Sequence, residues 1–322
     1  MRGRPPQDRS SQHKAMNEKK KTGGYILPAV LCNLLWGSAI PFINIGYRLF
    51  GIGGGDTGSQ MLFAGCRFFL AGLMTVLFRS LTLRRPALPQ GTKGWRAAGV
   101  LCLFQTVGQY VFFYIGVANT PSVRASIIQG LGAFVSILIA AWVFRYEKMD
   151  LHKWLGGMLG VLGVVAVTLN GSAEGSVKLT GEGFLILSMV CSAFSAGLIK
   201  HFASGQDPVA LSGWQFILGG CVLAAAGLAS GGRLRPDGIA AWGVLGYLAL
   251  LSAAAYGIWA VLLKKHPVSK VAVFMFLQPI FGVILGLILV DQPLTLPAYR
   301  YGLGLVLVSN SIWIVNRAEE RA

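Results

Sequence analysis

The sequence predicts an all-α integral membrane protein with ten transmembrane helices, arranged as two inverted five-helix repeats. Apolar stretches fill most of the chain between Tyr25 and Val315, and each is near the roughly 20 residues that cross the hydrocarbon core of a bilayer. The composition agrees, because 54% of the residues are hydrophobic, 12% are charged and the mean hydropathy is +0.61. Ordinary soluble domains do not have such a composition.

The ten expected spans follow one another with connections too short to form a soluble domain. They cover residues 25–49, 60–78, 97–117, 123–144, 153–170, 182–203, 209–230, 239–263, 270–290 and 297–315. Spans 209–230 and 239–263 carry many Gly and Ala, so a count that differs by one pair of helices stays open. Residues 1–24 are polar and lack the apolar core of a signal peptide, so we expect a disordered cytoplasmic tail.

The net charge of +16 is distributed in a way that predicts topology. With both termini in the cytoplasm, 21 Lys and Arg residues fall on the inside and six on the outside. Cytoplasmic loops of membrane proteins carry this kind of excess. We therefore expect a multi-pass protein of the cell (inner) membrane with both termini cytoplasmic, in contact with membrane lipid and with no nucleic-acid partner.

Residue types used in catalysis and metal binding are missing from the middle of the expected spans. All 12 Asp and Glu residues and all four His residues fall in tails, loops or span ends, and the five Cys residues have no metal-ligand spacing. Membrane-embedded enzymes need clustered acids or histidines. We expect no catalytic residue, no metal and no cofactor, and therefore no enzyme. Glu147 and Glu182 are the nearest candidates for a coupling proton, and we expect them to anchor helix ends instead.

Two weak internal matches divide the chain into halves. RFFLAGL at 67–73 aligns with QFILGGC at 215–221, an offset of 148, and 144–157 aligns with 289–302 at an offset of 145. The halves cover 25–171 and 181–316, with five spans in each. Because five is odd, the second half enters the membrane from the opposite side. This is the architecture of many secondary transporters, with a substrate site near the midplane where the repeats meet.

Small residues spaced four apart let membrane helices approach closely. Gly156 with Gly160, and Gly282 with Gly286, have this spacing. The chain contains 43 glycines, so a helix interface and simple abundance explain each pair equally well.

Polar and aromatic side chains inside the spans are the candidates for a solute site. Arg67 is the one charge well inside a span, and it is either structural or the group that attracts an anionic part of a substrate. Gln105 and Gln109 have the i, i+4 spacing of one helix face. Buried amides either make helix–helix hydrogen bonds or line a wet cavity. The candidate substrate-binding residues are Asn33, Trp36, Gln109, Tyr110, Gln129, Ser195, Tyr256, Trp259 and Gln278.

Four segments resemble the EamA-type members of the drug/metabolite transporter superfamily. LLWGSAIPFINIGY (34–47) has the Trp-Gly start and later Pro of the first helix, and CRFFLAGL (66–73) is similar to the Arg-Phe signature of the second. Residues 144–165 are similar to the family's Glu and glycine-rich fifth helix. LQPIFGVILGLILVDQP (277–293) resembles the ninth helix, with Gln292 where the family has a glutamate.

The resemblance implies a ten-helix exporter of small metabolites, amino acids, amines or drugs, built from two inverted five-helix repeats. It also implies a central cavity lined by Asn33, Trp36, Gln109, Gln129, Ser195, Tyr256 and Gln278. We therefore expect a secondary transporter of small organic solutes that works by alternating access.

Two other functions stay open. A carrier of lipid-linked or nucleotide-sugar substrates should need more than one cation facing the cavity, and a non-transporting membrane partner protein should use its buried amides for structure alone. The sequence also leaves open the solute, the coupling ion and whether the chain forms a homodimer.

Overall fold

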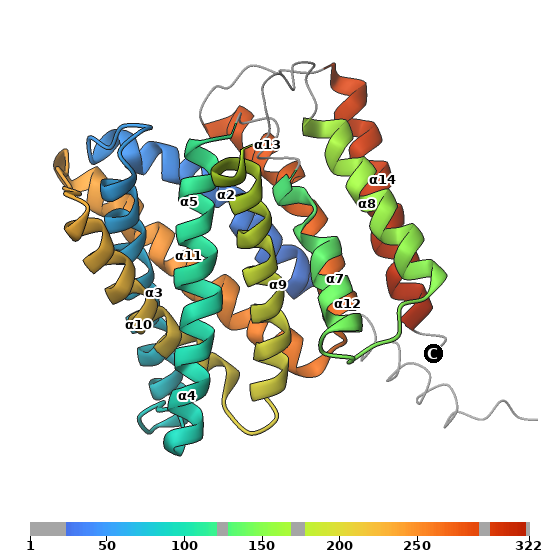
Figure 1. Ribbon diagram of the computed structural model, residues 1–322, viewed down its shortest axis with the longest axis horizontal. Coiled ribbons are helices and arrows are strands. Elements are labelled where there is room, and N and C mark those ends of the chain that lie inside the picture. The colour runs from blue at the N-terminus through green and yellow to red at the C-terminus, as the bar shows by residue number, and fades with distance from the viewer. Residues whose placement is uncertain (1–23, 121–127, 169–177, 290–296, 320–322) are drawn as a thin grey trace, which may run out of the picture.

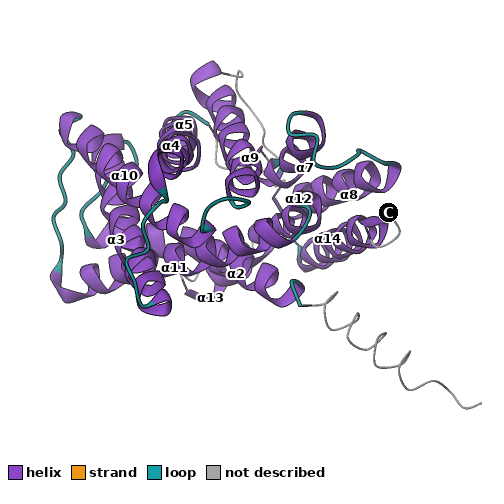
Figure 2. Ribbon diagram, turned by 90° about the horizontal axis from the view of Figure 1, so that it is seen from below, coloured by secondary structure: helices purple, strands orange, loops and turns teal. Residues whose placement is uncertain are grey.

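The structure, a computed structural model, describes residues 24–120, 128–168, 178–289 and 297–319 (Figure 1). Within these residues the chain forms helices and loops and no strand, which confirms the all-α class (Figure 2). The predicted tail up to residue 23, most of the connection between the halves and Gln292 lie outside the described residues.

Helices occupy the five spans expected in the first half, as far as the structure describes them. The first two are α2 (Ile26–Leu49), which continues through Pro41, and α3 (Thr57–Leu83). The third is composed of α4 (Gly91–Leu101), the π-helix η1 (Cys102–Gly108) and α5 (Gln109–Ala118). The last two are α7 (Gly132–Trp142) and α8 (Leu151–Thr168).

The described residues of the second half also form five successive helical segments. A short π-helix η2 (Leu179–Gly183) leads into α9 (Phe184–Phe202), followed by α10 (Pro208–Ala229) and α11 (Gly238–Lys265). The next rod consists of α12 (Val268–Ala272), the 3-10 helix η3 (Val273–Phe276) and α13 (Leu277–Leu289). The described chain ends with α14 (Ala298–Glu319).

Seven helices in the described part of the chain are long and apolar enough to cross a membrane. They are Ile26–Leu49, Thr57–Leu83, Gly91–Gly116, Leu179–Phe202, Pro208–Ala229, Gly238–Lys265 and Val268–Gly286. Ile128–Trp142 and Leu151–Ala166 are shorter apolar helices. The protein is therefore a multi-pass membrane protein, whereas the count of ten crossings stays a prediction.

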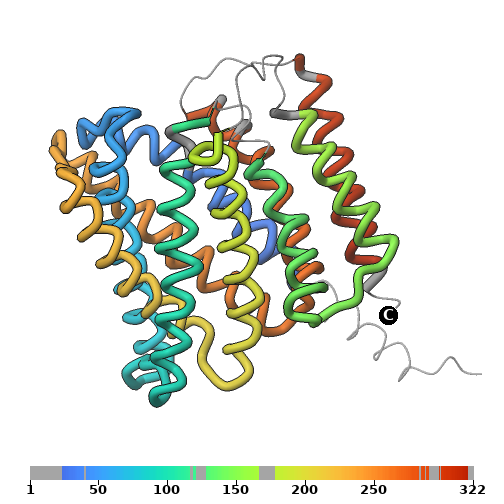
Figure 3. The backbone as a smooth tube through the Cα atoms, viewed as in Figure 1, coloured from blue at the N-terminus to red at the C-terminus, as the bar shows by residue number. Residues whose placement is uncertain are grey.

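Successive helices run back and forth, so the connections gather at two ends of the bundle (Figure 3). The connections after α3, α7, α9 and α11 lie at the lower end in Figure 1, and those after α2 and α10 lie at the upper end. The lower connections and adjoining helix ends contain many basic residues, among them Arg79, Arg84, Arg85, Arg145, Lys148, Lys200, Lys264 and Lys265. An excess of basic residues at one end of the bundle is the pattern expected for a cytoplasmic face.

Helices α3 and α10 cross with their backbones in contact along a line of glycines. Gly58, Gly65 and Gly72 repeat every seven residues on α3, as do Gly213, Gly220 and Gly227 on α10. A Cβ at Gly72 would lie 2.6 Å from Gly213 O, and one at Gly227 would lie 2.8 Å from Gly58 O. These pairings show that the two helices run antiparallel and that a larger side chain has no room between them.

A second contact of this kind joins α8 and α14. The Ser311 hydroxyl donates to Gly156 O at 2.6 Å, and a Cβ at Gly163 would lie 3.1 Å from Gly304 O. Gly156 therefore lies at a helix interface, which is one of the two interpretations its spacing allows. Since α3 and α10 are the second helices of their halves and α8 and α14 are the last, both contacts join equivalent helices. They lie on opposite sides of the bundle (Figures 1 and 2).

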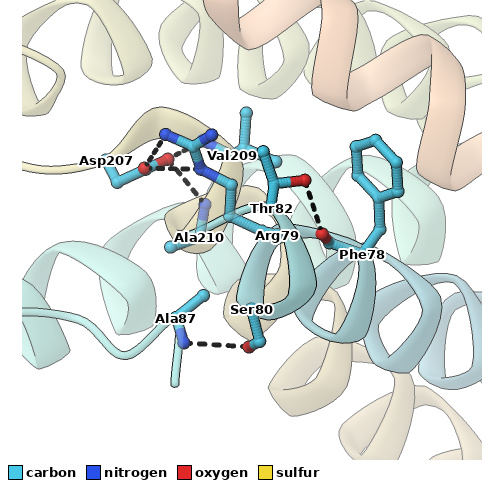
Figure 4. Close-up of polar contacts among 8 residues, drawn as sticks. All are labelled: Phe78, Arg79, Ser80, Thr82, Ala87, Asp207, Val209 and Ala210. Carbon is cyan, nitrogen blue, oxygen red and sulfur yellow. Dashed lines mark hydrogen bonds and ion pairs between the residues drawn. The ribbon is translucent and has the colours of Figure 1, made fainter. Parts of the chain in front are cut away.

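The lower ends of α3 and α10 are tied by an ion pair (Figure 4). Asp207 begins α10, because its Oδ1 accepts hydrogen bonds from the N–H groups of Val209 and Ala210 at 2.9 and 3.1 Å. Its Oδ2 accepts from Arg79 Nε at 2.7 Å and from Arg79 Nη2. Burial raises the pKa of the Asp207 carboxyl, but the hydrogen bonds from Arg79 and from the two backbone N–H groups outweigh it, so the pKa lies below its ordinary value.

The third helical segment contains a π-helix that the sequence does not predict. This π-helix, η1, spans Cys102–Gly108 and carries more residues per turn than an α-helix. Gln105 lies within it and is buried, and Gln109 follows it and is half-buried. A common face for these two amides stays a prediction.

The first prediction concerns the α3–α10 crossing. Gly72→Ala should lower the free energy of unfolding by about 1–3 kcal/mol, because the new Cβ meets backbone atoms of α10 that cannot move independently. Thermal unfolding in detergent measures the effect. Gly243→Ala on α11, which has open space around it, is the matched control and should show no loss. Equal effects of the two changes would contradict the tight crossing.

The second prediction concerns the Arg79–Asp207 pair. Asp207→Asn keeps a side chain that caps α10 but removes the negative charge. It should lower the free energy of unfolding by about 1 kcal/mol near neutral pH. Because the pKa of Asp207 is lowered in the folded state, the stabilisation is complete above about pH 4 and disappears as the pH falls through the folded-state pKa. Unfolding curves of both proteins should therefore converge at acidic pH. A stability difference that is constant down to pH 3 would contradict this assignment.

Candidate functional site

Four aromatic rings meet between the two halves of the chain. Phe68 of α3 stacks on Phe216 of α10 with ring centroids 5.1 Å apart, and its other neighbour is Tyr110 of α5 at 4.5 Å. Tyr256 of α11 meets Phe216 edge-on at 4.9 Å. The hydroxyls of Tyr110 and Tyr256 lie 3.1 Å apart, within hydrogen-bonding distance. Phe68, Tyr110, Phe216 and Tyr256 are called the central aromatic cluster below.

The central aromatic cluster is built from equivalent positions of the two halves. Phe68 and Phe216 are 148 positions apart, which is the offset of the repeat match around them. Tyr110 and Tyr256 are 146 positions apart on the equivalent helices α5 and α11. Like residues therefore contact like residues, as happens where a twofold axis relates two halves.

Polar side chains repeat this relationship next to the rings. Arg67 Nε donates to Ser252 Oγ at 3.0 Å, which ties α3 to α11. In the other half, Thr106 Oγ1 donates to Gln215 Oε1, which ties η1 to α10. Arg67 and Gln215 are 148 positions apart, and Thr106 and Ser252 are 146 apart. The two ties join equivalent positions, but they differ in charge and in direction. In the first tie the positively charged Arg67 donates to a hydroxyl, and in the second a hydroxyl donates to the neutral amide of Gln215.

Arg67 is a buried charge beside the central aromatic cluster. Its exposed fraction is 3%, and no carboxylate among the described residues pairs with it. The guanidinium carbon lies 5.2 Å from the centroid of the Phe68 ring, a cation–π contact.

Two tryptophans extend the central aromatic cluster. The Trp36 ring of α2 lies 5.0 Å from Tyr256 and 4.9 Å from Trp259, both in edge-on arrangements. Trp36 Nε1 is buried and has no hydrogen-bond partner among the described residues. A buried donor without a partner is costly, and a polar group of a ligand could satisfy it.

Of the predicted site residues, Trp36, Tyr110, Tyr256 and Trp259 come together, with Arg67 beside them. The five others do not join this group through the contacts of the described residues. Asn33 donates to Ala29 O and Ser195 to Ser192 O, both within their own helices.

The three remaining glutamines are placed as follows. Gln109 accepts a hydrogen bond from Ser188 through its backbone oxygen, and the backbone oxygen of Gln278 faces Gly37 of α2. Gln129 Nε2 is buried without a partner in the described part of the chain. A role for these residues in binding stays a prediction.

Phe68 and Phe216 belong to the central aromatic cluster, and Thr106 and Ser252 make the polar ties next to it. None of the four is in the predicted set. The repeat offset was the signal that could have identified them, because adding 148 to Phe68 or 146 to Thr106 reaches a residue of similar chemistry. Taken singly, each looks like an ordinary residue of a membrane helix.

Glu147 and Glu182, the two carboxylates near span ends, accept hydrogen bonds from groups at neighbouring helix ends. Glu147 Oε2 accepts from Lys153 Nζ at 3.0 Å, and its Oε1 accepts from Ser269 N–H at the start of α12 at 3.1 Å. Glu182 Oε2 accepts from Lys178 N–H at 2.9 Å, next to the start of η2. These contacts are those of residues that anchor helix ends.

A surface pocket lies away from the central aromatic cluster, at the basic end of the bundle. It is lined by Tyr146, Lys200, His201, Ala203, Ser204 and Lys264. Burial lowers the pKa of nearby His266, and the ammonium groups of Lys270, Lys200 and Lys265 lower it further, so this imidazole is neutral at pH 7. The pocket is a feature of the charged end and not of the repeat interface.

Curated proteins of similar sequence include several transporters. The chain is 28% identical to an uncharacterized transporter of Synechocystis over 80% of this chain and 81% of the relative. It is 25% identical to an uncharacterized transporter of Archaeoglobus fulgidus over 88% and 95% of the two chains. A probable amino-acid metabolite efflux pump of Salmonella typhimurium is 24% identical over 83% of this chain and 87% of its own.

A solved crystal structure has the same fold, with a TM-score of 0.74 at 16% identity, covering 93% of this chain and 98% of the other. The EamA-like transporter family matches residues 23–169 and again 179–317, one match in each half. These two matches cover nearly the whole chain and agree with the equivalent helices, paired rings and paired polar ties described above. The protein is therefore a transporter of the EamA-like family, with two EamA repeats in one chain.

Proposed function

We propose that the protein exports small organic solutes from the cytoplasm by alternating access, with the central aromatic cluster as part of the solute site. The solutes are small metabolites, amino acids, amines or drugs. The observation that carries the proposal is the cluster itself, where like residues of two antiparallel halves meet around buried polar groups. Transporters with inverted repeats bind their substrates at such a junction.

Two kinds of contact between the halves support a rocking motion. The α3–α10 crossing is close and made of backbone, so it is suited to act as a pivot. The Tyr110–Tyr256 contact is a single hydrogen bond between neutral hydroxyls and is worth only about 0.5–1.5 kcal/mol. Separation of these two tyrosines would admit a solute to the cluster without disturbing the pivot.

The proposed membrane arrangement has ten crossings in two inverted repeats, 25–171 and 181–316. The basic lower end in Figure 1 faces the cytoplasm together with both termini, and the membrane is the cell (inner) membrane. Export as the direction is supported by the Salmonella relative, whose name describes an efflux pump for amino-acid metabolites.

The aromatic faces of Trp36, Tyr256 and Trp259 indicate what part of a solute would bind. Flat apolar groups pack on such faces, and ammonium groups make cation–π contacts with them. Buried polar atoms nearby would orient the solute. This combination suits small amphipathic molecules better than strongly charged ones.

The third prediction tests the solute site. The purified protein in detergent is screened by thermal shift against amino acids, amines, nucleosides and cationic drugs. At least one of these classes of compound should raise the unfolding temperature, since a ligand that binds only the folded state stabilises it. Tyr256→Ala removes the ring shared by Trp36, Phe216 and Tyr110, and should lower the affinity for that class about tenfold or more.

The control variant is Tyr299→Ala, at a tyrosine that is 71% exposed, and it should keep the full thermal shift. Vesicles that contain the wild-type protein should also release the same solute faster than empty vesicles. An affinity that is unchanged by Tyr256→Ala would contradict the central aromatic cluster as the site. Absence of any stabilising class would favour a carrier of lipid-linked or nucleotide-sugar substrates or a non-transporting role.

A further inference from the structure

We propose that Arg67, together with the Trp36 indole N–H, recognises a carboxylate group on the transported solute. The inference rests on the proposed function, because it names the chemical class of solute that the same site takes. In this proposal the positive charge of Arg67 serves to bind the solute and not to pack the helices. The solute is thus a small monocarboxylate with an apolar, aromatic or ammonium-bearing remainder.

The comparison of the two halves shows that packing does not require the charge. Gln215 occupies the position equivalent to Arg67, and it ties α10 to η1 by accepting a hydrogen bond from Thr106. Arg67 ties α3 to α11 by donating a hydrogen bond to Ser252. A neutral amide therefore makes the equivalent helix–helix contact, and the guanidinium at residue 67 adds a charge that this contact does not use.

Burial makes that charge expensive unless an anion accompanies it. Arg67 is 3% exposed and lies within α3, and the described residues supply no carboxylate to it. Charges in this situation are rare in membrane helices and mark binding or transport sites. An anionic group of a solute would supply the missing counter-charge.

The number of donors indicates which anion fits. Arg67 donates to Ser252 through Nε alone. The two Nη groups of the guanidinium can therefore donate to both oxygens of a carboxylate. Trp36 Nε1 is a further buried donor without a partner among the described residues, on a ring that contacts Tyr256. One cation balances one negative charge, so a carboxylate is favoured over a phosphate with two.

Both groups lie next to Tyr256. Tyr256 is in edge-on contact with Trp36. Ser252, which accepts the hydrogen bond from Arg67, lies one turn before Tyr256 on the same face of α11. A carboxylate near Tyr256 would therefore have the guanidinium and the indole N–H as neighbours. The remainder of the solute would lie against Trp36 and Trp259, whose centroids are 4.9 Å apart.

The fourth prediction uses pairs of probes that differ only in the charged group. L-leucine is compared with L-leucinamide, and benzoate with benzamide, by thermal shift and by exchange in vesicles that contain the full-length protein. The wild type should prefer the carboxylate member of at least one pair. Arg67→Gln, which reproduces the equivalent residue Gln215, should lower that carboxylate affinity about thirtyfold or more and leave the amide affinity within a few-fold.

Thr106→Ala is the matched control, because it removes the equivalent helix–helix tie without touching the charge. It should keep the carboxylate preference even where it lowers stability. If Arg67→Gln does not fold, Arg67→Lys is measured in its place. It should also bind the carboxylate more weakly, since an ammonium cannot make the paired hydrogen bonds of a guanidinium.

The outcomes separate this inference from the proposed function. Transport of amides or amines with no carboxylate preference in the wild type would overturn the inference alone. A folded Arg67→Gln or Arg67→Lys protein with unchanged carboxylate affinity would do the same, and would make Arg67 purely structural. Failure of the wild type to bind or move any small solute would overturn the proposed function and the inference with it.

Discussion

The backbone contact between α3 and α10 determines how the two halves of the chain meet. In a bilayer, helices gain little from burying apolar side chains against each other, so close packing and hydrogen bonds decide which helices associate. Three glycines on each helix, spaced seven apart, bring the antiparallel backbones together over most of their length. The α8–α14 contact repeats this arrangement on the opposite side of the bundle. Together these contacts define an approximate twofold relationship between the halves.

The ring and polar contacts at the centre follow from this relationship. A residue near a twofold axis meets its own equivalent, which is why Phe68 lies on Phe216 and Tyr110 faces Tyr256. Residues slightly off the axis form two equivalent contacts instead, as Arg67 with Ser252 and Gln215 with Thr106 do. The site is thus a product of the duplication, and its departure from symmetry at Arg67 is the feature that needs a separate explanation.

The helical class, the multi-pass character and the family were predictable from the sequence, because apolar length and the order of motifs depend on local residues. Trp36, Tyr110, Tyr256 and Trp259, which contact one another in the structure, are four of the nine predicted binding residues. The glycine line on α3 and α10 was not predictable in this way, since its spacing of seven differs from the spacing of four that is typical of close contacts between membrane helices. The π-helix η1 could not be predicted either, because no residue type encodes the extra residue in its turns. Asn33 and Ser195 each donate a hydrogen bond within their own helix, a contact that depends on side-chain rotation.

The difference between Arg67 and Gln215 has a consequence for the resting state of the protein. A chain of two identical inverted halves would have inward-open and outward-open forms of equal free energy, each populated half the time. Every residue that differs between the halves removes this degeneracy. A difference of about 1.4 kcal/mol already gives a tenfold bias, and a buried guanidinium opposite a neutral amide can readily supply it. In the proposed alternating-access cycle, the unequal pair of side chains at the centre is therefore one of the differences that bias the direction in which the empty protein waits.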